Sequence, residues 1–197
     1  MKPWASLCAA FALVACGQTA SVTGDVLKAS LARQDLGTKP LLLADVAELG
    51  VAATLQIGAQ DRGITTWQTA DGVTLSFRNG IVTATRGLPE DLMVSDTAAV
   101  ARAVRTGGAS YNRINDYIGG EDQTIRVVFE CTQTGRNRET LATLRAQVTV
   151  TKVTETCRTS AQSIENTYWI GGDGIMWKSQ QWVSPLVGYL KTERLVR

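Results

Sequence analysis

Carboxylates are the side chains of this chain best suited to acid–base chemistry, because the sequence contains no histidine. The lack of imidazole excludes Ser-His and Cys-His nucleophile pairs, imidazole metal sites and the commonest general base near neutral pH. Two carboxyl groups at a set separation would suffice for glycoside hydrolysis. The candidates are Glu90, Asp91, Asp96, Glu165 and Asp173. Their pattern does not distinguish them from turn residues or solvated charges, so we expect no enzymatic activity and keep a carboxylate-based glycosidase as the weaker alternative.

Two cysteines in the body of the chain predict a disulfide. Cys131 and Cys157 are 26 residues apart, and in an oxidising compartment such a pair is usually bonded. The chain-entropy contribution of a loop of this length is roughly 3.5 kcal/mol. Two free buried thiols are the alternative, because the sequence does not show whether the geometry allows a bond. Two thiolates are too few for a zinc site, so we expect neither a metal nor a cofactor.

Aromatic side chains are the candidates for a binding surface, because their faces stack on sugar rings. Trp182, Trp67 and Tyr189 are the predicted contacts with a ligand or partner. Core packing is the competing role for all of them. It is the preferred role for Trp169 and Trp177, whose spacing suits cross-strand packing.

The elements that position these residues are mainly strands. A helix is expected from Asp25 to Gln34, where Leu27 and Leu31 are four residues apart. Residues 97–105 could form a short helix, and residues 110–119 could be strand or loop. Strands are expected where Val, Ile, Thr and aromatic residues concentrate: residues 51–58, 64–69, 73–78, 81–86, 123–133, 141–156, 165–170, 175–183 and 187–195.

The dipeptide Asn79-Gly80 predicts a tight hairpin, because both residues tolerate positive φ angles. A two-residue turn there places Phe77 opposite Val82 and Leu75 opposite Ala84. One face of the hairpin is then apolar and the other polar. This pattern is typical of an antiparallel sheet with one face on a core.

The run Gly171–Gly174 predicts a second reversal. Its simplest register sets Tyr168 against Trp177 and Trp169 against Met176. A phosphate-binding loop is the alternative for a glycine-rich run, but such a loop leads from a strand into a helix. Here a strand is expected on both sides, so the hairpin is favoured.

The N-terminal segment has the features of an export signal. Lys2 is followed by a short apolar run, and residues Leu13–Cys16 resemble the bacterial lipobox. We expect residues 1–15 to be a cleaved signal peptide, Cys16 to carry the lipid, and residues 16–23 to form a tether. A secretory signal that merely contains Cys16 is the alternative. Gly17 after the cysteine favours the outer membrane.

The remaining residues, 24–197, suit a single β-rich domain. The formal net charge of the whole chain is only +2, and lysine and arginine form no block, so nucleic acid is not an expected partner. The early apolar run is shorter than the roughly 20 residues of a spanning helix. Attachment to the outer-membrane bilayer is therefore expected through acyl chains, several of which make a stable anchor.

Two blocks of the sequence resemble the YjbF/GfcB family of lipoproteins. The first is DGVTLSFRNGIVTATRGLPEDL at residues 71–92, and the second comprises NTYWI at 166–170, Gly174, MWKSQQ at 176–181 and Pro185. The resemblance implies an outer-membrane lipoprotein encoded with capsule or exopolysaccharide export genes, without established catalytic activity. It also implies an antiparallel β-fold like an incomplete barrel wrapped on a helix. Cys16 is the one functional residue that carries over.

We therefore expect a mostly β protein, in which an antiparallel meander forms an incomplete barrel or strongly curved sheet with a short N-terminal helix. The favoured function is that of a non-enzymatic lipoprotein, lipid-anchored to the outer membrane and facing the periplasm. It would assist exopolysaccharide or capsule assembly and secretion, with export proteins or the polysaccharide as partners. The alternative is a periplasmic carrier module that holds a glycan or lipid on its β-surface.

Overall fold

The computed structural model describes residues 22–108, 110–119 and 123–197. The predicted signal peptide, the lipobox and Cys16 lie outside the described residues. No helix in the described part has the length and apolar composition needed to cross a bilayer.

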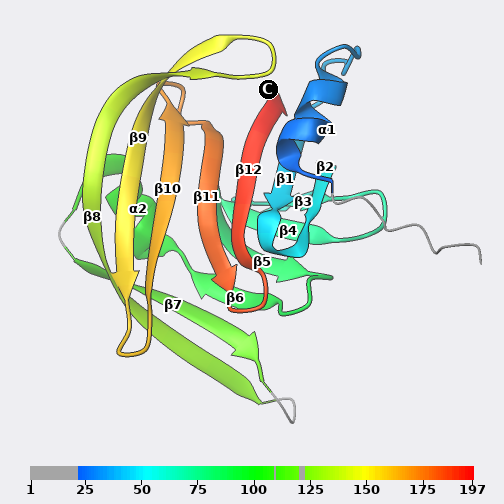
Figure 1. The fold of residues 1–197 in the computed structure, drawn as a ribbon. Helices are drawn as coiled ribbons and strands as arrows, with labels where there is room; N and C mark the ends of the chain where they lie inside the picture. Colours follow the sequence, from blue (N-terminus) through cyan, green and yellow to red (C-terminus); the bar gives the residue numbers. More distant parts are fainter. Residues whose placement is uncertain (1–21, 109, 120–122) are drawn as a thin grey trace, which may run out of the picture.

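In the described residues, a single antiparallel sheet of 12 strands curls into a nearly closed barrel, accompanied by two α-helices (Figure 1). The sheet order is β5-β4-β3-β2-β1-β12-β11-β10-β9-β8-β7-β6. The predicted fold class, mostly β with an incomplete barrel and a short N-terminal helix, is confirmed. The elements are α1 Gly24–Leu31, β1 Leu41–Val46, a 3-10 turn Ala47–Leu49, β2 Val51–Asp61, β3 Ile64–Gln68, β4 Thr74–Arg78, β5 Ile81–Arg86, β6 Leu92–Asp96, α2 Ala98–Thr106, β7 Tyr111–Ile118, β8 Thr124–Ala142, β9 Gln147–Arg158, β10 Ser163–Gly171, β11 Met176–Ser184 and β12 Gly188–Val196.

The barrel has one seam, between the two end strands β5 and β6, which side chains bridge in place of a backbone ladder. The Arg86 guanidinium donates to the carbonyl oxygens of Leu92 at 3.2 Å and Met93 at 3.3 Å. The Leu92 amide donates to Thr85 Oγ1 at 2.9 Å, and this hydroxyl donates to Asp91 Oδ1 at 2.7 Å. These bonds satisfy strand-edge groups that an open seam would leave unpaired.

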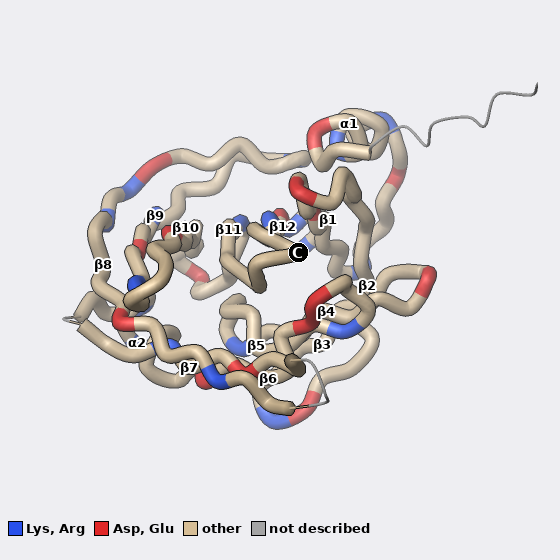
Figure 2. The backbone as a smooth tube through the Cα atoms, turned by 60° about the horizontal axis from the view of Figure 1, so that its bottom comes forward, with Lys and Arg blue, Asp and Glu red and all other residues tan. Residues whose placement is uncertain are grey.

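The two helices lie on opposite sides of the sheet. On the outer side, Leu31 of α1 packs against Leu43 and Leu195 of β1 and β12, and Figure 2 shows α1 outside the ring of strands. On the inner side, Val100 and Val104 of α2 pack in one cluster with inward-facing residues of the sheet, including Tyr168. The sheet therefore curls around α2.

Some predicted elements differ from the observed ones. The structure adds strands β1 and β6, which the sequence patterns did not reveal. The strand expected at residues 141–156 is wrong, because a turn closed by the Thr143 amide and the Ala146 carbonyl, 2.8 Å apart, separates β8 from β9. Residues 110–119 contain strand β7, and α2 occupies the region of the helix expected at 97–105.

The register of the Asn79-Gly80 hairpin is partly as predicted. Asn79 and Gly80 have φ angles of 52° and 82°, and Phe77 lies opposite Val82. A bulge between Ser76 and Phe77 then places Leu75 opposite Thr85. The predicted pairing of Leu75 with Ala84 is wrong because it assumed a regular ladder.

The Gly171–Gly174 run forms a hairpin turn between β10 and β11, as predicted. The turn is wider than expected, because the Gly171 amide bonds to the Ile175 carbonyl at 2.9 Å and a bulge follows Trp169. Tyr168 consequently pairs with Ser179, and Trp169 pairs with Lys178. The predicted pairings of these two aromatics with Trp177 and Met176 are wrong.

Candidate functional site

A group of polar side chains lies buried inside the barrel, which we call the Glu155 cluster: Tyr111, Arg113, Glu155, Asn166 and Tyr168. Glu155 and Asn166 are opposite each other in the β9–β10 ladder, and Tyr168 follows two residues later on the same face. Tyr111 and Arg113 lie on β7, two strands away from β9. Glu155, Asn166 and Tyr168 are 0% exposed, and Arg113 is 2% exposed.

Hydrogen bonds saturate the Glu155 carboxylate. Its Oε1 accepts from Arg113 Nη2 at 2.6 Å, from the Tyr168 hydroxyl at 2.7 Å and from Asn166 Nδ2 at 2.8 Å. Its Oε2 accepts from the Tyr111 hydroxyl. Asn166 also accepts from the Trp182 amide at 2.7 Å, which ties the cluster to β11 where the β10–β11 ladder has ended.

Electrostatics keeps Glu155 ionised. Burial alone would raise the pKa of this carboxyl, but the Arg113 charge and the bonds from Tyr111, Tyr168 and Asn166 together hold its pKa below the ordinary value. Burial raises the pKa of both tyrosines, so they remain neutral donors. An ionised carboxylate with four donors and no exposed surface is not placed to exchange protons with a substrate. The cluster therefore serves the architecture of the barrel.

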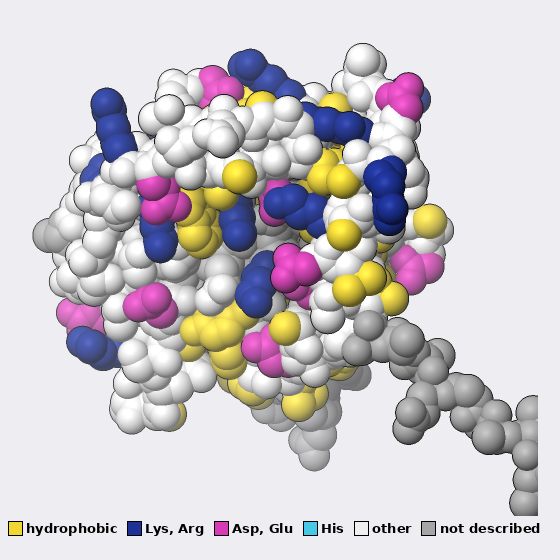
Figure 3. Space-filling view, turned by 45° about the horizontal axis from the view of Figure 1, so that its top comes forward, with side chains coloured by type: hydrophobic (Ala, Val, Ile, Leu, Met, Phe, Trp, Pro, Cys, Tyr) yellow, Lys and Arg dark blue, Asp and Glu magenta, His cyan; other side chains and the backbone are white. Residues whose placement is uncertain are grey.

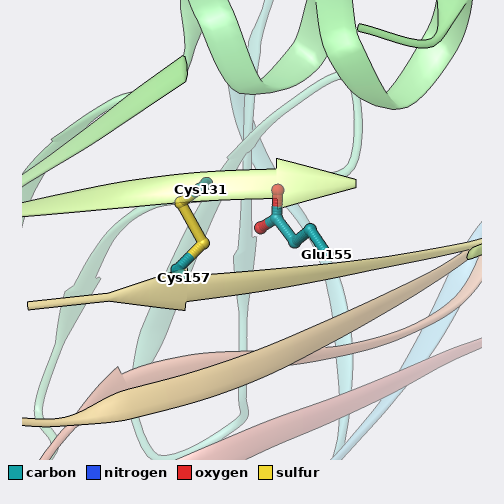
Figure 4. Close-up of side chains that lie close together, drawn as sticks. All are labelled: Cys131, Glu155 and Cys157. Atoms are coloured by element: carbon teal, nitrogen blue, oxygen red, sulfur yellow. A yellow bond between two sulfur atoms is a disulfide. The ribbon is translucent and has the colours of Figure 1, made fainter. Parts of the chain in front are cut away.

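Beside the cluster, the structure joins Cys131 and Cys157 in a disulfide with an S–S distance of 2.04 Å. The two cysteines are opposite each other in the β8–β9 ladder and are 0% exposed. With Glu155 they form the kind of three-residue group that could hold a metal ion (Figure 4). The donors do not fit that role, because bonded sulfurs are not thiolates, the carboxylate oxygens are occupied, and the Arg113 charge would repel a cation.

The predicted aromatic contacts fall into two separate places. Trp67 is 3% exposed and belongs to the main apolar cluster of the barrel. Trp182 and Tyr189 are half-buried neighbours whose ring centroids are 5.3 Å apart, edge to face. Trp182 also packs against the cluster that contains Ile164. Trp67 and Trp182 both pack against apolar neighbours, and the predicted contact of the three aromatic residues with a ligand or partner stays a prediction.

The acidic residues singled out from the sequence mostly cap local backbone. Asp91 accepts from the Gly87 amide at 2.9 Å, and Asp96 accepts from the Ala98 amide at 3.1 Å. Asp173 accepts from the Ile175 amide at 3.0 Å within its turn. Glu90 accepts from the Leu186 amide at 3.0 Å, and Glu165 is exposed. Among the carboxylates of the described residues, Glu155 is the most deeply buried, at 0% exposure, and it was not among the candidates chosen from the sequence.

A contact across the barrel interior separates the Glu155 cluster from the strands on the other side. Gln181 of β11 donates to the Gly80 carbonyl at 2.8 Å and accepts from the Val82 amide at 3.0 Å. The strands approach closely there, since a Cβ on Gly80 would stand 2.4 Å from that of Met176. Beside this contact lies a cavity lined by residues of β1, β3, β4, β11 and β12 and by the turns between strands.

This cavity, which we call the upper cavity, has a volume of about 230 Å³. It lies at the barrel end where the C-terminus emerges. Figure 3 views the molecule with this end turned forward and shows lysine and arginine side chains around a hollow. Inward-facing strand residues and three turns line the cavity: Leu42, Gly63, Thr65, Trp67, Phe77, Asn79, Gly80, Gly174, Ile175, Met176, Thr192 and Arg194.

The fold and its interior define a small antiparallel barrel with a buried ionic cluster and a cavity at one end that contains Arg194. The chain belongs to the family described as group 4 capsule polysaccharide lipoprotein GfcB, YjbF, whose match covers residues 27–195. The resemblance stated from the sequence is thereby confirmed.

Among solved structures, a similar one is that of the hypothetical lipoprotein YmcC from Escherichia coli K12. The TM-score is 0.66 at 17% sequence identity, and the alignment covers 91% of this chain and 98% of that chain. At this identity the likeness shows the fold alone. No curated protein matches the chain.

Proposed function

We propose that this protein is an outer-membrane lipoprotein that assists the assembly or secretion of a capsule or exopolysaccharide and does not convert the polymer chemically. The family match over residues 27–195 carries this proposal. The Glu155 cluster supports the non-enzymatic part of the proposal. Both oxygens of the Glu155 carboxylate already accept hydrogen bonds, and the side chain has no surface exposed to a substrate.

The test of the non-enzymatic part uses the full-length lipoprotein in detergent with extracellular polysaccharide purified from the host. We expect the chain length and the number of reducing ends to stay unchanged over prolonged incubation. A fall in chain length that depends on the protein would contradict the non-enzymatic role and favour a glycosidase or lyase.

The proposed anchor is the lipid on Cys16, with the barrel facing the periplasm. The lipobox-like residues Leu13–Cys16 support it, as does membership of a lipoprotein family. Cys16→Ser should move the protein from the outer-membrane fraction to the soluble periplasmic fraction. Incorporation of labelled fatty acid into the Cys16→Ser protein would refute this attachment site.

A glycan-binding carrier is the second candidate function. The observation that favours it is the upper cavity, where a tryptophan and an arginine lie together at a solvent-accessible end of the barrel. The two functions are compatible, because an export factor that binds the polymer would need such a site.

A further inference from the structure

The guanidinium of Arg194 has no hydrogen-bond acceptor among the described residues. Its side chain is half-buried in the upper cavity, and its Nε is fully buried without a hydrogen-bond partner. Within the described part of the chain, no nitrogen of its guanidinium takes part in a hydrogen bond or salt bridge. Buried polar groups are paired in the great majority of cases, so an unpaired guanidinium at a cavity calls for an explanation.

The two other arginines of the described residues that are not exposed each have at least one acceptor. Arg113 donates through Nη2 to Glu155 and Tyr168, although its Nε is also buried without a partner. Arg78 donates to the Arg62 carbonyl at 3.0 Å. Arg194 instead lies over the ring of Trp67, with its guanidinium carbon 4.6 Å from the ring centroid. This cation–π contact orients the guanidinium but satisfies none of its five donors.

The charges around the upper cavity do not neutralise Arg194. Burial lowers the pKa of Arg194, with no contribution from a neighbouring carboxylate. The acidic residues at the adjacent turns already have basic neighbours: Asp61 is 3.8 Å from Arg62, and Asp173 is 3.3 Å from Arg197. The cavity thus presents an uncompensated positive charge.

The remaining lining suits a small polar ligand. Thr65 and Thr192 contribute hydroxyl groups, while Trp67 and Phe77 contribute apolar surface. The volume of about 230 Å³ is below the roughly 300–1,000 Å³ of sites that enclose drug-sized molecules. It has room for one compact group at a time, and a guanidinium fork matches the two oxygens of a carboxylate or phosphate.

We propose that the upper cavity binds the oxyanion of an acidic sugar residue, either a uronate carboxylate or a sugar phosphate, through the guanidinium of Arg194. The assignment to a sugar rests on the proposed function, whereas the anion site rests on Arg194 and its surroundings. The protein would then hold a polysaccharide at single acidic residues, at the end of the barrel marked by the C-terminus.

The test titrates the full-length protein in detergent with glucuronate, glucose 1-phosphate, inorganic phosphate and neutral glucose. Binding is monitored by NMR. The variants are Arg194→Met, which keeps an apolar stem over Trp67, and Arg194→Lys, which keeps the charge without the fork. Arg158→Gln is the matched control, because Arg158 is exposed at the C-terminal end of β9, away from the upper cavity. The same samples are unfolded thermally.

We expect a sugar acid or sugar phosphate to bind the wild type, with glucose showing no saturation. Arg194→Met should weaken binding tenfold or more, in line with the loss of a charge-assisted pair of hydrogen bonds. Arg194→Lys should be intermediate, and Arg158→Gln should match the wild type. The tighter of glucuronate and glucose 1-phosphate identifies the oxyanion. Tighter binding of inorganic phosphate than of either sugar would overturn the assignment to a sugar.

Thermal unfolding separates a binding role from a structural one. Arg194→Met should unfold at a higher temperature than the wild type, because it removes a half-buried charge that has no partner. A lower midpoint for Arg194→Met, or equal anion affinity in the wild type and Arg194→Met, would overturn the proposal. Loss of polysaccharide export in cells is a separate readout, so a failure of the proposed function would be recognised independently.

Discussion

Replacing Glu155 with glutamine should destabilise the barrel strongly at neutral pH. The substitution preserves the shape of the side chain but leaves the Arg113 charge, 2% exposed, without its counterion. It also replaces an oxygen that accepts from Tyr111 by an amide group or forces a flip that loses the bonds at Oε1. Removal of one partner of a buried ion pair typically costs about 3–5 kcal/mol. For a domain of this size, that loss corresponds to a fall in Tm of roughly 6–20 °C.

The assay is denaturant unfolding of the wild type, Glu155→Gln, and the control Glu165→Gln, whose carboxylate is exposed on the neighbouring strand. The pH dependence adds a second readout. Because the folded-state pKa of Glu155 is lowered, its contribution is complete above the unfolded pKa of about 4.3 and is lost as the pH falls through the folded value. The difference between wild type and Glu155→Gln should therefore shrink in acid.

A double variant, Glu155→Gln with Arg113→Met, should recover part of the loss, because no unpaired charge then remains buried. If Glu155→Gln changes the free energy of unfolding no more than Glu165→Gln does, the buried ion pair does not stabilise the barrel as described. A loss of stability that does not depend on pH would contradict it equally.

Further predictions concern the disulfide, the seam and the half-buried indole of Trp182. The double variant Cys131→Ala/Cys157→Ala should lose roughly 3.5 kcal/mol of the free energy of unfolding. Alkylation of the wild-type cysteines should require both denaturation and reduction, since both are 0% exposed. Alkylation of denatured protein without reduction would contradict the disulfide. Arg86→Met should speed hydrogen exchange of amides in β5 and β6 relative to β9, because the Arg86 guanidinium bridges the seam through the carbonyls of Leu92 and Met93. An equal change in exchange rate in β5, β6 and β9 would count against that role. Trp182→Ala should destabilise the protein by no more than the about 3–5 kcal/mol of a core tryptophan, because the indole packs near Ile164 but is only half-buried. Denaturant unfolding measures the loss, and a loss below about 1 kcal/mol would indicate a surface role.

Local sequence patterns predicted the strands that have strong β-formers and clear turns. The run at residues 81–86 matches β5 residue for residue, and the Asn79-Gly80 turn gave the correct Phe77–Val82 pair. The predicted pairings of Leu75 and Tyr168 are wrong, because bulges in these hairpins shift the ladder by one residue or more. A bulge depends on the packing of the whole sheet, and the strand sequence does not specify it. Strand β1, read as LLLADV, has no alternation because α1 covers its outer face.

The Glu155 cluster was missed because its members come from three strands, one of which, β7, is distant in the sequence from β9 and β10. One local signal existed: Val153, Glu155 and Cys157 alternate along β9, and the first and last are the kind of residue that faces a core. That alternation places Glu155 inward. Its partner Arg113 lies 42 residues away, and only the order β9-β8-β7 in the sheet brings the two together. No spacing rule within one segment reveals such a pair.

The proposed role in polysaccharide export, without chemical change of the polymer, is tested most directly in a host strain that lacks the protein. The measurement is the amount and chain length of cell-surface polysaccharide, with and without restoration of the wild-type chain. We expect less polysaccharide at the surface of the deficient strain, unchanged linkages and chain length in the polymer that remains, and recovery on restoration. Normal export in the deficient strain, or export of a polymer with altered chain length, would contradict it.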